Sequence, residues 1–444
     1  MIEPLFELPT AETLTTPAPK GGKPRVERPN RQQVAMHLAA LDDLLPPEHL
    51  ARVIWSLVEQ LDLSAFYARI QAIEGVAGHP AIDPGLLVAL WLYATADGVG
   101  SARQLDRLTR EHIAYQWLCG QVTVNYHTLA DFRVAHEREL DALLTQQVAG
   151  LMAAGLVTLE RTAQDGVRVR ASAGAGSFRR RERLEQFQAE AQTRVAQLKA
   201  QAQAEADTRG PRQQAAQERS ARERLERVQA ALREMEVLEQ RKAKDHKKRE
   251  KRKAPRVSTT DPQARIIKMP DAGYRPAYNA ELAVDTASGV IVGLDVINEV
   301  DQGQISPMVE QIQARYGRRP DAHLVDGGFV THSDLETVAA HGVTVYAPLP
   351  LPRAKDQDPT QARASDGPGV RAWRERMQTA AAKVIYKLRA QTIEWANAGV
   401  RQRGLYQFRV RSQCKARAVV LWLALIHNLL IQFRLTSQSA VGTA

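Results

Sequence analysis

The stretch YNAELAVDTASGVIVGLDVI, residues 278–297, decides the fold class of this chain. Apolar side chains occupy every second position from Tyr278 to Val284, and this period of two is typical of a β-strand. Ser288-Gly289 supplies a turn, and residues 290–297 have the composition of a second strand. The stretch therefore predicts two consecutive strands joined by a short turn.

Helices and strands alternate downstream of these two strands. Ser306-Pro307 predicts the start of a helix that continues to about Tyr316, and residues 323–326 predict a short buried strand. Ser333 and Glu336 match a capping box at the start of the next helix, and residues 343–347 predict another strand. Strands connected by a crossover helix run parallel in one sheet.

Other segments place a strand before this region and helices after it. Asp165 begins the strand-like run 165–169, residues 371 to about 401 predict a helix, and residues 416–433 predict a last buried helix. Residues 350–369 have the composition of a loop. The complete order favours a mixed α/β sheet with flanking helices. Asp326 then lies at the carboxyl end of a parallel strand, where open α/β sheets place their sites.

The first 155 residues follow a different pattern. Residues 1–30 combine several prolines with small and polar side chains and predict a flexible arm. Residues 31–155 predict an all-α domain, in which Asp83-Pro84 caps and starts a helix. Further helices are expected at residues 102–108, 111–118 and 128–153. Such helices suit a helix-turn-helix DNA reader, and they also suit a bundle that serves packing or dimerisation.

A long helical insert, residues 178–256, interrupts the sheet region. Two apolar stripes, Leu184 to Leu198 and Leu225 to Met235, lie on either side of Gly210-Pro211, which should break any helix. The insert therefore predicts an antiparallel helical hairpin. Its end, residues 241–253, holds nine basic and two acidic side chains. Such a run is often only a solvated helix face, but its charge bias favours phosphate contacts by Lys247, Lys248, Arg249, Lys251, Arg252 and Lys253.

The overall composition agrees with a nucleic-acid partner. The 444 residues include 60 Lys and Arg against 50 Asp and Glu, and the formal net charge of +10 favours a polyanion. Cys119 and Cys414 support no disulfide framework and fit a reducing cytoplasm. The amino terminus lacks a signal-peptide pattern, and residues 418–433 are too short and too polar to span a bilayer. We expect a cytoplasmic protein with no membrane segment.

Three carboxylates, Asp165, Asp326 and Glu394, lie in contexts that could bring them to one metal site. Two carboxylates on strands and one on a helix can hold two Mg²⁺ or Mn²⁺ ions for phosphoryl transfer. No cluster of Cys and His residues with zinc-binding spacing competes with them. Asp285 and Asp295 are alternative candidates for a ligand position, but the first ends a strand at a turn and the second lies in the middle of a strand.

The helix that carries Glu394 presents further functional groups on the same face. At 100° per residue, Tyr386, Arg389, Glu394 and Arg401 fall within an arc of about 140°. The two arginines could hold DNA phosphates, and the phenol could donate a hydrogen bond. Gly399 could end the helix before Arg401.

These motifs together resemble the DDE transposases of bacterial insertion sequences, a superfamily with an RNase H-like catalytic core. The resemblance is to the branch of the insertion-sequence four/five-like enzymes that carries a helical insert. It covers almost the whole chain and rests on the helical region and six motifs, namely residues 83–133, Asp165-Gly166, residues 276–285, residues 325–329, Tyr386-x-x-Arg389-x-x-x-x-Glu394, Gly404-Leu405 and His427-Asn428-Leu429. The basic residue seven positions after the glutamate is commonly lysine in the family and is Arg401 here, which changes its geometry.

The resemblance implies Asp165, Asp326 and Glu394 as catalytic residues that cleave the ends of an element and join the freed 3′-hydroxyl to target DNA. Two ends must be held together, so it also implies a homodimer or higher assembly. The implied RNase H-like domain comprises residues 156–177 and 257–435, followed by a flexible tail at 436–444. The residues leave two alternatives open: a non-catalytic DNA-binding protein, and an RNase H-like nuclease without strand transfer.

Overall fold

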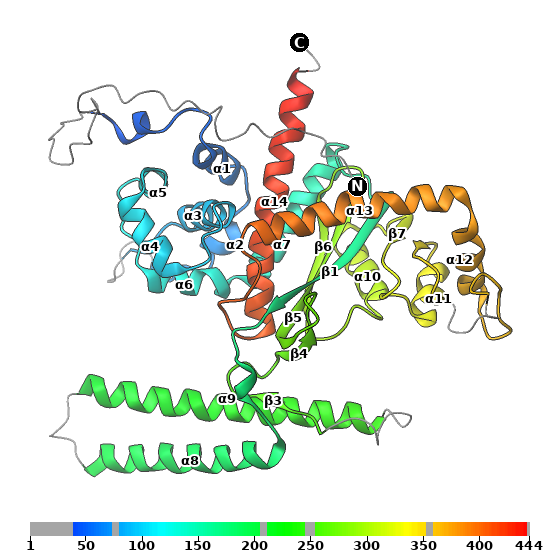
Figure 1. The fold of residues 1–444 in the computed structure, drawn as a ribbon. Coiled ribbons are helices and arrows are strands. Elements are labelled where there is room, and N and C mark those ends of the chain that lie inside the picture. Colours follow the sequence, from blue (N-terminus) through cyan, green and yellow to red (C-terminus); the bar gives the residue numbers. More distant parts are fainter. Residues whose placement is uncertain (1–38, 73–79, 205–210, 245–253, 352–357, 442–444) are drawn as a thin grey trace, which may run out of the picture. The chain divides into compact units, whose positions relative to one another are not determined.

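The structure is a computed structural model that describes residues 39–72, 80–204, 211–244, 254–351 and 358–441 (Figure 1). Described residues from Leu41 onward belong to one unit. The predicted arm at residues 1–30 lies outside the described residues. The domain boundaries given above stay predictions, because a single unit contains both the helical region and the sheet.

A mixed sheet forms the centre of the molecule, and its strands run in the order β6-β5-β1-β7-β8. β5 pairs antiparallel with both β1 and β6, whereas β7 is parallel to β1 and β8 is parallel to β7. This arrangement is the RNase H-like core that we predicted. The strands span Arg161–Arg170 (β1), Tyr274–Asp285 (β5), Ile291–Ile297 (β6), Ala322–Leu324 (β7) and Thr344–Tyr346 (β8).

Three short strands were not predicted. β4 (Arg265–Lys268) pairs with the beginning of β5. β2 (Phe178–Arg179) and β3 (Val257–Ser258) form a separate two-stranded sheet. This small sheet lies at the root of the insert, so it closes the loop from which the hairpin extends.

Helices connect and cover the sheet as the crossover argument requires. α10 (Ile305–Tyr316) leads from β6 to β7, and α11 (His332–Ala340) leads from β7 to β8. α13 (Ala380–Gln402) packs on β1 and β5, and α14 (Gln413–Val441) packs on β6. Asn428 on α14 accepts a hydrogen bond from the Ile291 backbone N–H at 2.8 Å and donates one to its carbonyl at 2.9 Å. These two bonds satisfy the backbone of an outer strand.

α14 is the one helix among the described residues with the length and hydropathy that could cross a membrane, over Gln413–Thr436. Its most apolar window is 72% buried inside the protein. That burial is typical of a core helix and agrees with the buried helix predicted for residues 416–433.

A group of helices precedes the sheet and packs against α14. Asp83 caps α3 by accepting a hydrogen bond from the Gly85 N–H at 2.9 Å, as predicted. The predicted single helix at 128–153 is wrong, because the chain breaks at His136, whose ring packs against Phe66 and Phe132. The helices span Leu50–Val58 (α1), Ser64–Tyr67 (α2), Pro84–Ala96 (α3), Ala102–Glu111 (α4), Ile113–Cys119 (α5), Tyr126–Ala135 (α6) and Glu137–Ala153 (α7).

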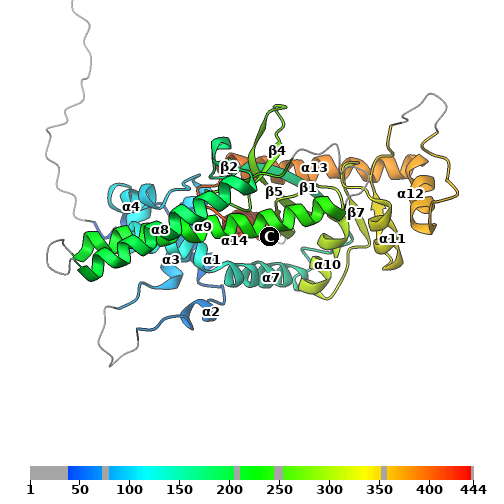
Figure 2. The same ribbon diagram turned by 90° about the horizontal axis from the view of Figure 1, so that it is seen from below.

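The insert forms two long helices, α8 (Arg181–Ala204) and α9 (Pro211–Lys244), which lie side by side in both views (Figures 1 and 2). Leu184 and Leu198 on α8 are buried, as are Val228 and Met235 on α9. The two predicted stripes therefore pack against each other within one chain. The six basic residues from Lys247 to Lys253 lie outside the described residues.

The structure corrects three predictions near the carboxyl terminus. Thr331, not Ser333, caps α11, and Glu336 instead accepts hydrogen bonds from the Gly369 and Val370 N–H groups. The predicted helix at 371–401 divides into α12 (Pro368–Gln378) and α13, because Thr379 leaves the helical conformation and caps α13. α14 continues to Val441 through most of the predicted tail.

Candidate active site

Asp165 lies in the middle of β1 and faces α13. Its Oδ1 forms an ion pair with Arg389 Nη2 at 3.0 Å, and its Oδ2 accepts a hydrogen bond from Asn397 Nδ2 at 2.9 Å. Burial raises the pKa of Asp165, the Arg389 charge opposes that rise, and the charges of Asp326 and Asp301 add to it. The strand thus holds a carboxylate in a partly desolvated, negatively charged environment.

Asp326 lies beside Asp165 because β7 runs parallel to β1. The register pairs Leu324 with Ala163, so continuing it by two residues places Asp326 opposite Asp165. Adjacent strands are about 4.8 Å apart. A Cβ at residue 328 would lie 2.9 Å from Asp326 Oδ1, and the Gly328 N–H donates to that same oxygen. Gly328 therefore allows the backbone to turn tightly around the carboxylate.

Glu394 is an exposed side chain on α13. The charges of Asp326, Asp165 and Glu394 each raise the pKa of Tyr386, although burial is the largest cause of that rise and Arg389 opposes it. All three carboxylates are thus near enough to act on one phenol. Among the described residues, however, no three carboxylate, imidazole or thiol groups are already close enough to hold a metal ion.

The predicted DNA-contacting residues on α13 have different surroundings. The Arg389 side chain is 11% exposed, and its guanidinium forms an ion pair with Asp165. Tyr386 is half-buried. Arg401 lies in the last turn of the helix, with no carboxylate within 4 Å among the described residues. Their contacts with DNA stay predictions.

A polar network that the sequence analysis missed lies on the opposite face of the sheet from Asp165. Glu281 accepts hydrogen bonds from Gln164 Nε2 at 3.0 Å and Asn279 Nδ2 at 2.6 Å, and Asn279 Nδ2 also donates to Asp301 Oδ1 at 2.6 Å. Burial, followed by the charge of Asp301, raises the pKa of Glu281 well above its usual range. Asn279 and Glu281 alternate with the apolar residues of β5, and the strand is buried on both faces. Two polar side chains in a buried strand were the sequence feature that could have indicated this network.

The two competing carboxylates have structural roles. Asp285 is fully buried and accepts hydrogen bonds from Leu159 N, Ser288 N and Ser288 Oγ, which fix the turn after β5. Asp295 accepts from the Val296 N–H at 2.8 Å and pairs with Arg417 at 3.3 Å. These partners give both side chains a role in the fold.

Comparison with known proteins agrees with the architecture. Residues 39–135 match the family model of a transposase domain (DUF772), and residues 254–431 match that of a transposase DDE domain. The second match contains Asp326 and Glu394, whereas Asp165 lies between the two matched ranges. No curated protein and no solved structure gave a match. With two transposase models that together match more than half of its length, this chain belongs to the DDE transposases of insertion sequences.

Proposed function

We propose that this transposase binds the terminal inverted repeats of its element, cleaves the DNA there and joins the freed 3′-hydroxyl to target DNA. Asp165, Asp326 and Glu394 carry the reaction. The observation that supports this most strongly is the parallel register of β1 and β7, which sets Asp326 beside Asp165 under α13.

The donor atoms around Asp165 suit a hard divalent cation such as Mg²⁺ or Mn²⁺. They are carboxylate oxygens, and the amide oxygen of Asn397 is buried there with no hydrogen-bond partner among the residues that the structure describes. Two such ions, held by the three carboxylates, would activate a water and stabilise the pentacovalent phosphate and the leaving oxygen.

The chain's own residues bind and orient the DNA. Arg389 now neutralises Asp165, and in the DNA complex its guanidinium turns to the neighbouring phosphate, for which its forked donors are suited. Tyr386 donates a hydrogen bond beside it. Arg401 and the basic run of residues 247–253 contact phosphates further along the duplex.

The assembly and location follow from the reaction. Both ends of an element must be joined, so at least two copies of the chain act together on DNA. The helical region that precedes the sheet reads the repeat sequence. A bacterial element resides in chromosomal DNA, so the protein works in the cytoplasm at the nucleoid.

The test is metal-dependent nicking of a duplex that carries the inverted repeats flanking the gene. Asp326→Asn keeps the size of the side chain and removes its charge. We expect it to lower the nicking rate at least about 100-fold, because mutating residues that only hydrogen-bond to metal ligands already costs about 10–100-fold in activity. Asp165→Asn and Glu394→Gln should behave alike. The matched control is Asp321→Asn, an exposed carboxylate five residues earlier whose ion pair in the described part of the chain is with Arg318.

Product analysis distinguishes the remaining alternatives. Nicking followed by transfer of the 3′ end to a second duplex supports the proposal, whereas nicking without transfer would identify a nuclease. Undiminished nicking by Asp326→Asn would exclude this site. Binding without any metal-dependent cleavage would identify a DNA-binding protein.

A further inference from the structure

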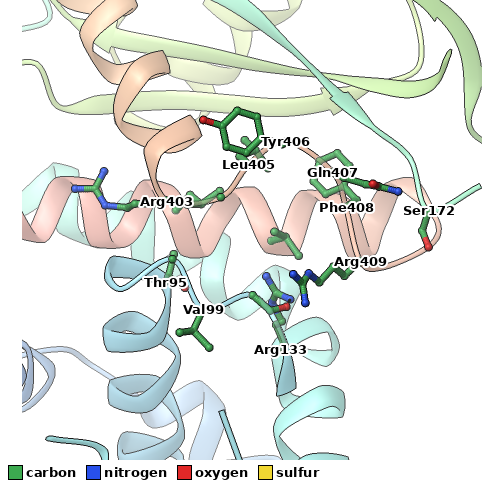
Figure 3. A pocket seen from close by; sticks show the side chains of 15 residues that line it. Thr95, Val99, Arg133, Ser172, Arg403, Leu405, Tyr406, Gln407, Phe408 and Arg409 are labelled. Carbon is green, nitrogen blue, oxygen red and sulfur yellow. Dashed lines mark hydrogen bonds between the residues drawn. The ribbon is translucent and has the colours of Figure 1, made fainter. Parts of the chain in front are cut away.

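A basic cavity of about 660 Å³ lies where the amino-terminal helices meet the carboxyl end of α13 (Figure 3). Arg133 comes from α6, Arg403 follows the last turn of α13, and Arg409 lies in the segment before α14. Figure 3 shows the guanidinium groups of Arg133 and Arg409 beside each other. Arg133 and Arg409, which are 276 residues apart in the sequence, thus place two positive charges side by side in this cavity.

None of the described residues that line this cavity is acidic. Among the described residues, no carboxylate lies within 4 Å of any of its three arginines. Arg133 stacks over the Trp91 ring at 4.8 Å and donates one hydrogen bond to the Gly100 carbonyl, but its Nε is buried and has no partner within the described parts of the chain. Burial and the charge of Arg409 together lower the pKa of Arg133 to about 10.

Another partly buried arginine shows how the same fold neutralises a cation. Arg417 on α14 pairs with Glu137, with Asp141 at 2.7 Å and with Asp295 at 3.3 Å. Burying cations without counter-charges is costly. Arg133 and Arg403 are partly buried without such a counter-charge in the described ranges, and the exposed Arg409 adds a third positive charge beside Arg133. The cavity therefore has the electrostatics of a site whose anion comes from outside the chain.

The cavity is held in shape by the backbone. Arg170, at the end of β1, donates its N–H to the Tyr406 carbonyl at 3.1 Å and accepts from the Phe408 N–H at 2.8 Å. These bonds fix the segment that presents Arg409. Gly404 has φ +90°, a conformation suited to glycine, and it allows the chain to turn directly after Arg403.

We propose that this cavity binds a backbone phosphate of the DNA on which the transposase acts, several nucleotides from the phosphate at Asp165. The proposal rests on the proposed function for the identity of the anion. Glu394 lies on α13 and Arg403 directly follows that helix nine residues later, which corresponds to about 13 Å at 1.5 Å per residue. Asp165 lies on β1 and Ser172 follows the end of that strand, seven residues later, which corresponds to at most about 23 Å of extended chain. At 3.4 Å of helix axis per phosphate of one strand, the spacing is roughly four to seven nucleotides.

The experiment measures DNA binding without divalent metal, so that cleavage plays no part. Fluorescence anisotropy of a labelled inverted-repeat duplex is recorded from 50 to 200 mM salt for the wild type, Arg409→Gln and Arg409→Lys. Loss of one phosphate contact should lower the slope of log affinity against log salt by about 0.9, so the wild type should lose about 3.5-fold more affinity over this range than Arg409→Gln. Arg409→Lys should retain most of the slope. Arg318→Gln, which removes an arginine already paired with Asp321, is the control.

A second measurement locates the phosphate. Neutral methylphosphonate linkages are placed one at a time along the repeat. One linkage, roughly four to seven nucleotides from the cleavage point, should weaken binding by the wild type and have no further effect on Arg409→Gln.

The outcomes separate this inference from the proposed function. If Arg409→Gln binds the duplex with the wild-type slope, the cavity does not hold DNA, even if nicking at Asp326 is intact. If inorganic phosphate stabilises the wild type but not Arg409→Gln, while duplex binding is equal, the cavity takes a small anion and the proposal is wrong. A lost slope in a protein that never cleaves would leave the DNA contact standing and overturn the catalytic proposal.

Discussion

Gly166 gives the sharpest test of how the sheet supports the candidate active site. The residue follows Asp165 on β1, and a Cβ at this position would lie 2.5 Å from Asp301 Oδ1 and 2.6 Å from Asn279 Oδ1. Gly166→Ala therefore drives a methyl group into the hydrogen bond between Asn279 and Asp301. Real Cβ contacts are rarely below 3.0 Å, so the Asn279 and Asp301 side chains or β1 must move by roughly 0.5 Å or more, on the scale at which overpacked cores respond.

This displacement should affect stability and activity together. Overpacking of a well-packed site costs about 1–3 kcal/mol, which corresponds to a lowering of the thermal midpoint by several degrees. Asp165 is the next residue, and a misplacement approaching 1 Å at a reacting centre can cost on the order of 100-fold in rate. We expect Gly166→Ala to lose about 10- to 100-fold in nicking at temperatures where it is still folded.

The assays are thermal unfolding by circular dichroism and the nicking assay on the repeat duplex. The control is Gly150→Ala on α7, where an added Cβ meets nothing within 4 Å. That substitution should be neutral or stabilise by up to about 1 kcal/mol, because alanine favours the helix. A Gly166→Ala protein as stable and as active as Gly150→Ala would refute the packing argument.

Two further predictions concern the buried polar groups of the sheet. Since the pKa of Glu281 is raised above 4.5 in the folded state, the folded protein holds a proton that the unfolded chain releases, and stability should fall as pH rises from about 4.5 through the folded pKa. Glu281→Gln has no such proton to lose, so its thermal midpoint should depend less on pH over this range, and an unchanged pH profile would contradict the assignment. Asn428→Ala removes both hydrogen bonds to Ile291 and leaves buried backbone groups unpaired, which should destabilise the protein by about 2–5 kcal/mol. Thr436→Ala, on the exposed part of the same helix, should change the midpoint little, and equal midpoints for the two variants would contradict this role of Asn428.

The order and type of the main strands were predictable because their signals are local. The period of two in residues 278–284 indicates β5 whatever surrounds it, and the crossover helix α11 predicts that β7 and β8 run parallel. The same argument placed Asp326 at the carboxyl end of a parallel strand, but its closeness to Asp165 depends on the pairing of β7 with β1, which only the structure gives. The breaks at His136 and Thr379 were missed because the first is fixed by packing on Phe66, and the helical pattern continues through both positions.

The groups that were not predicted depend on contacts distant in sequence. Thr331 and Ser333 both have the chemistry of a helix cap, and only the turn after Asp326 decides between them. The network around Glu281 requires Asp301, which comes from a loop after β6 with no motif of its own. The arginine cavity is formed by α6 together with the segment before α14, so its arginines are too far apart in the sequence for a local pattern to reveal it.

The centre of the sheet, like the arginine cavity, holds partly buried charges of one sign with few partners of the other among the parts of the chain that are described. Elsewhere, partly buried charges such as Arg417 have several partners. Around β1, by contrast, Asp165, Asp301, Asp326 and Glu281 share Arg389 and Arg168 as their paired cations among the described residues, and burial raises the pKa of two of the four. Repulsion among neighbouring carboxylates destabilises the fold unless another cation binds between them. A divalent ion at Asp165 would lower that repulsion and release Arg389, so the feature that costs stability in the free protein is the one that the proposed reaction requires.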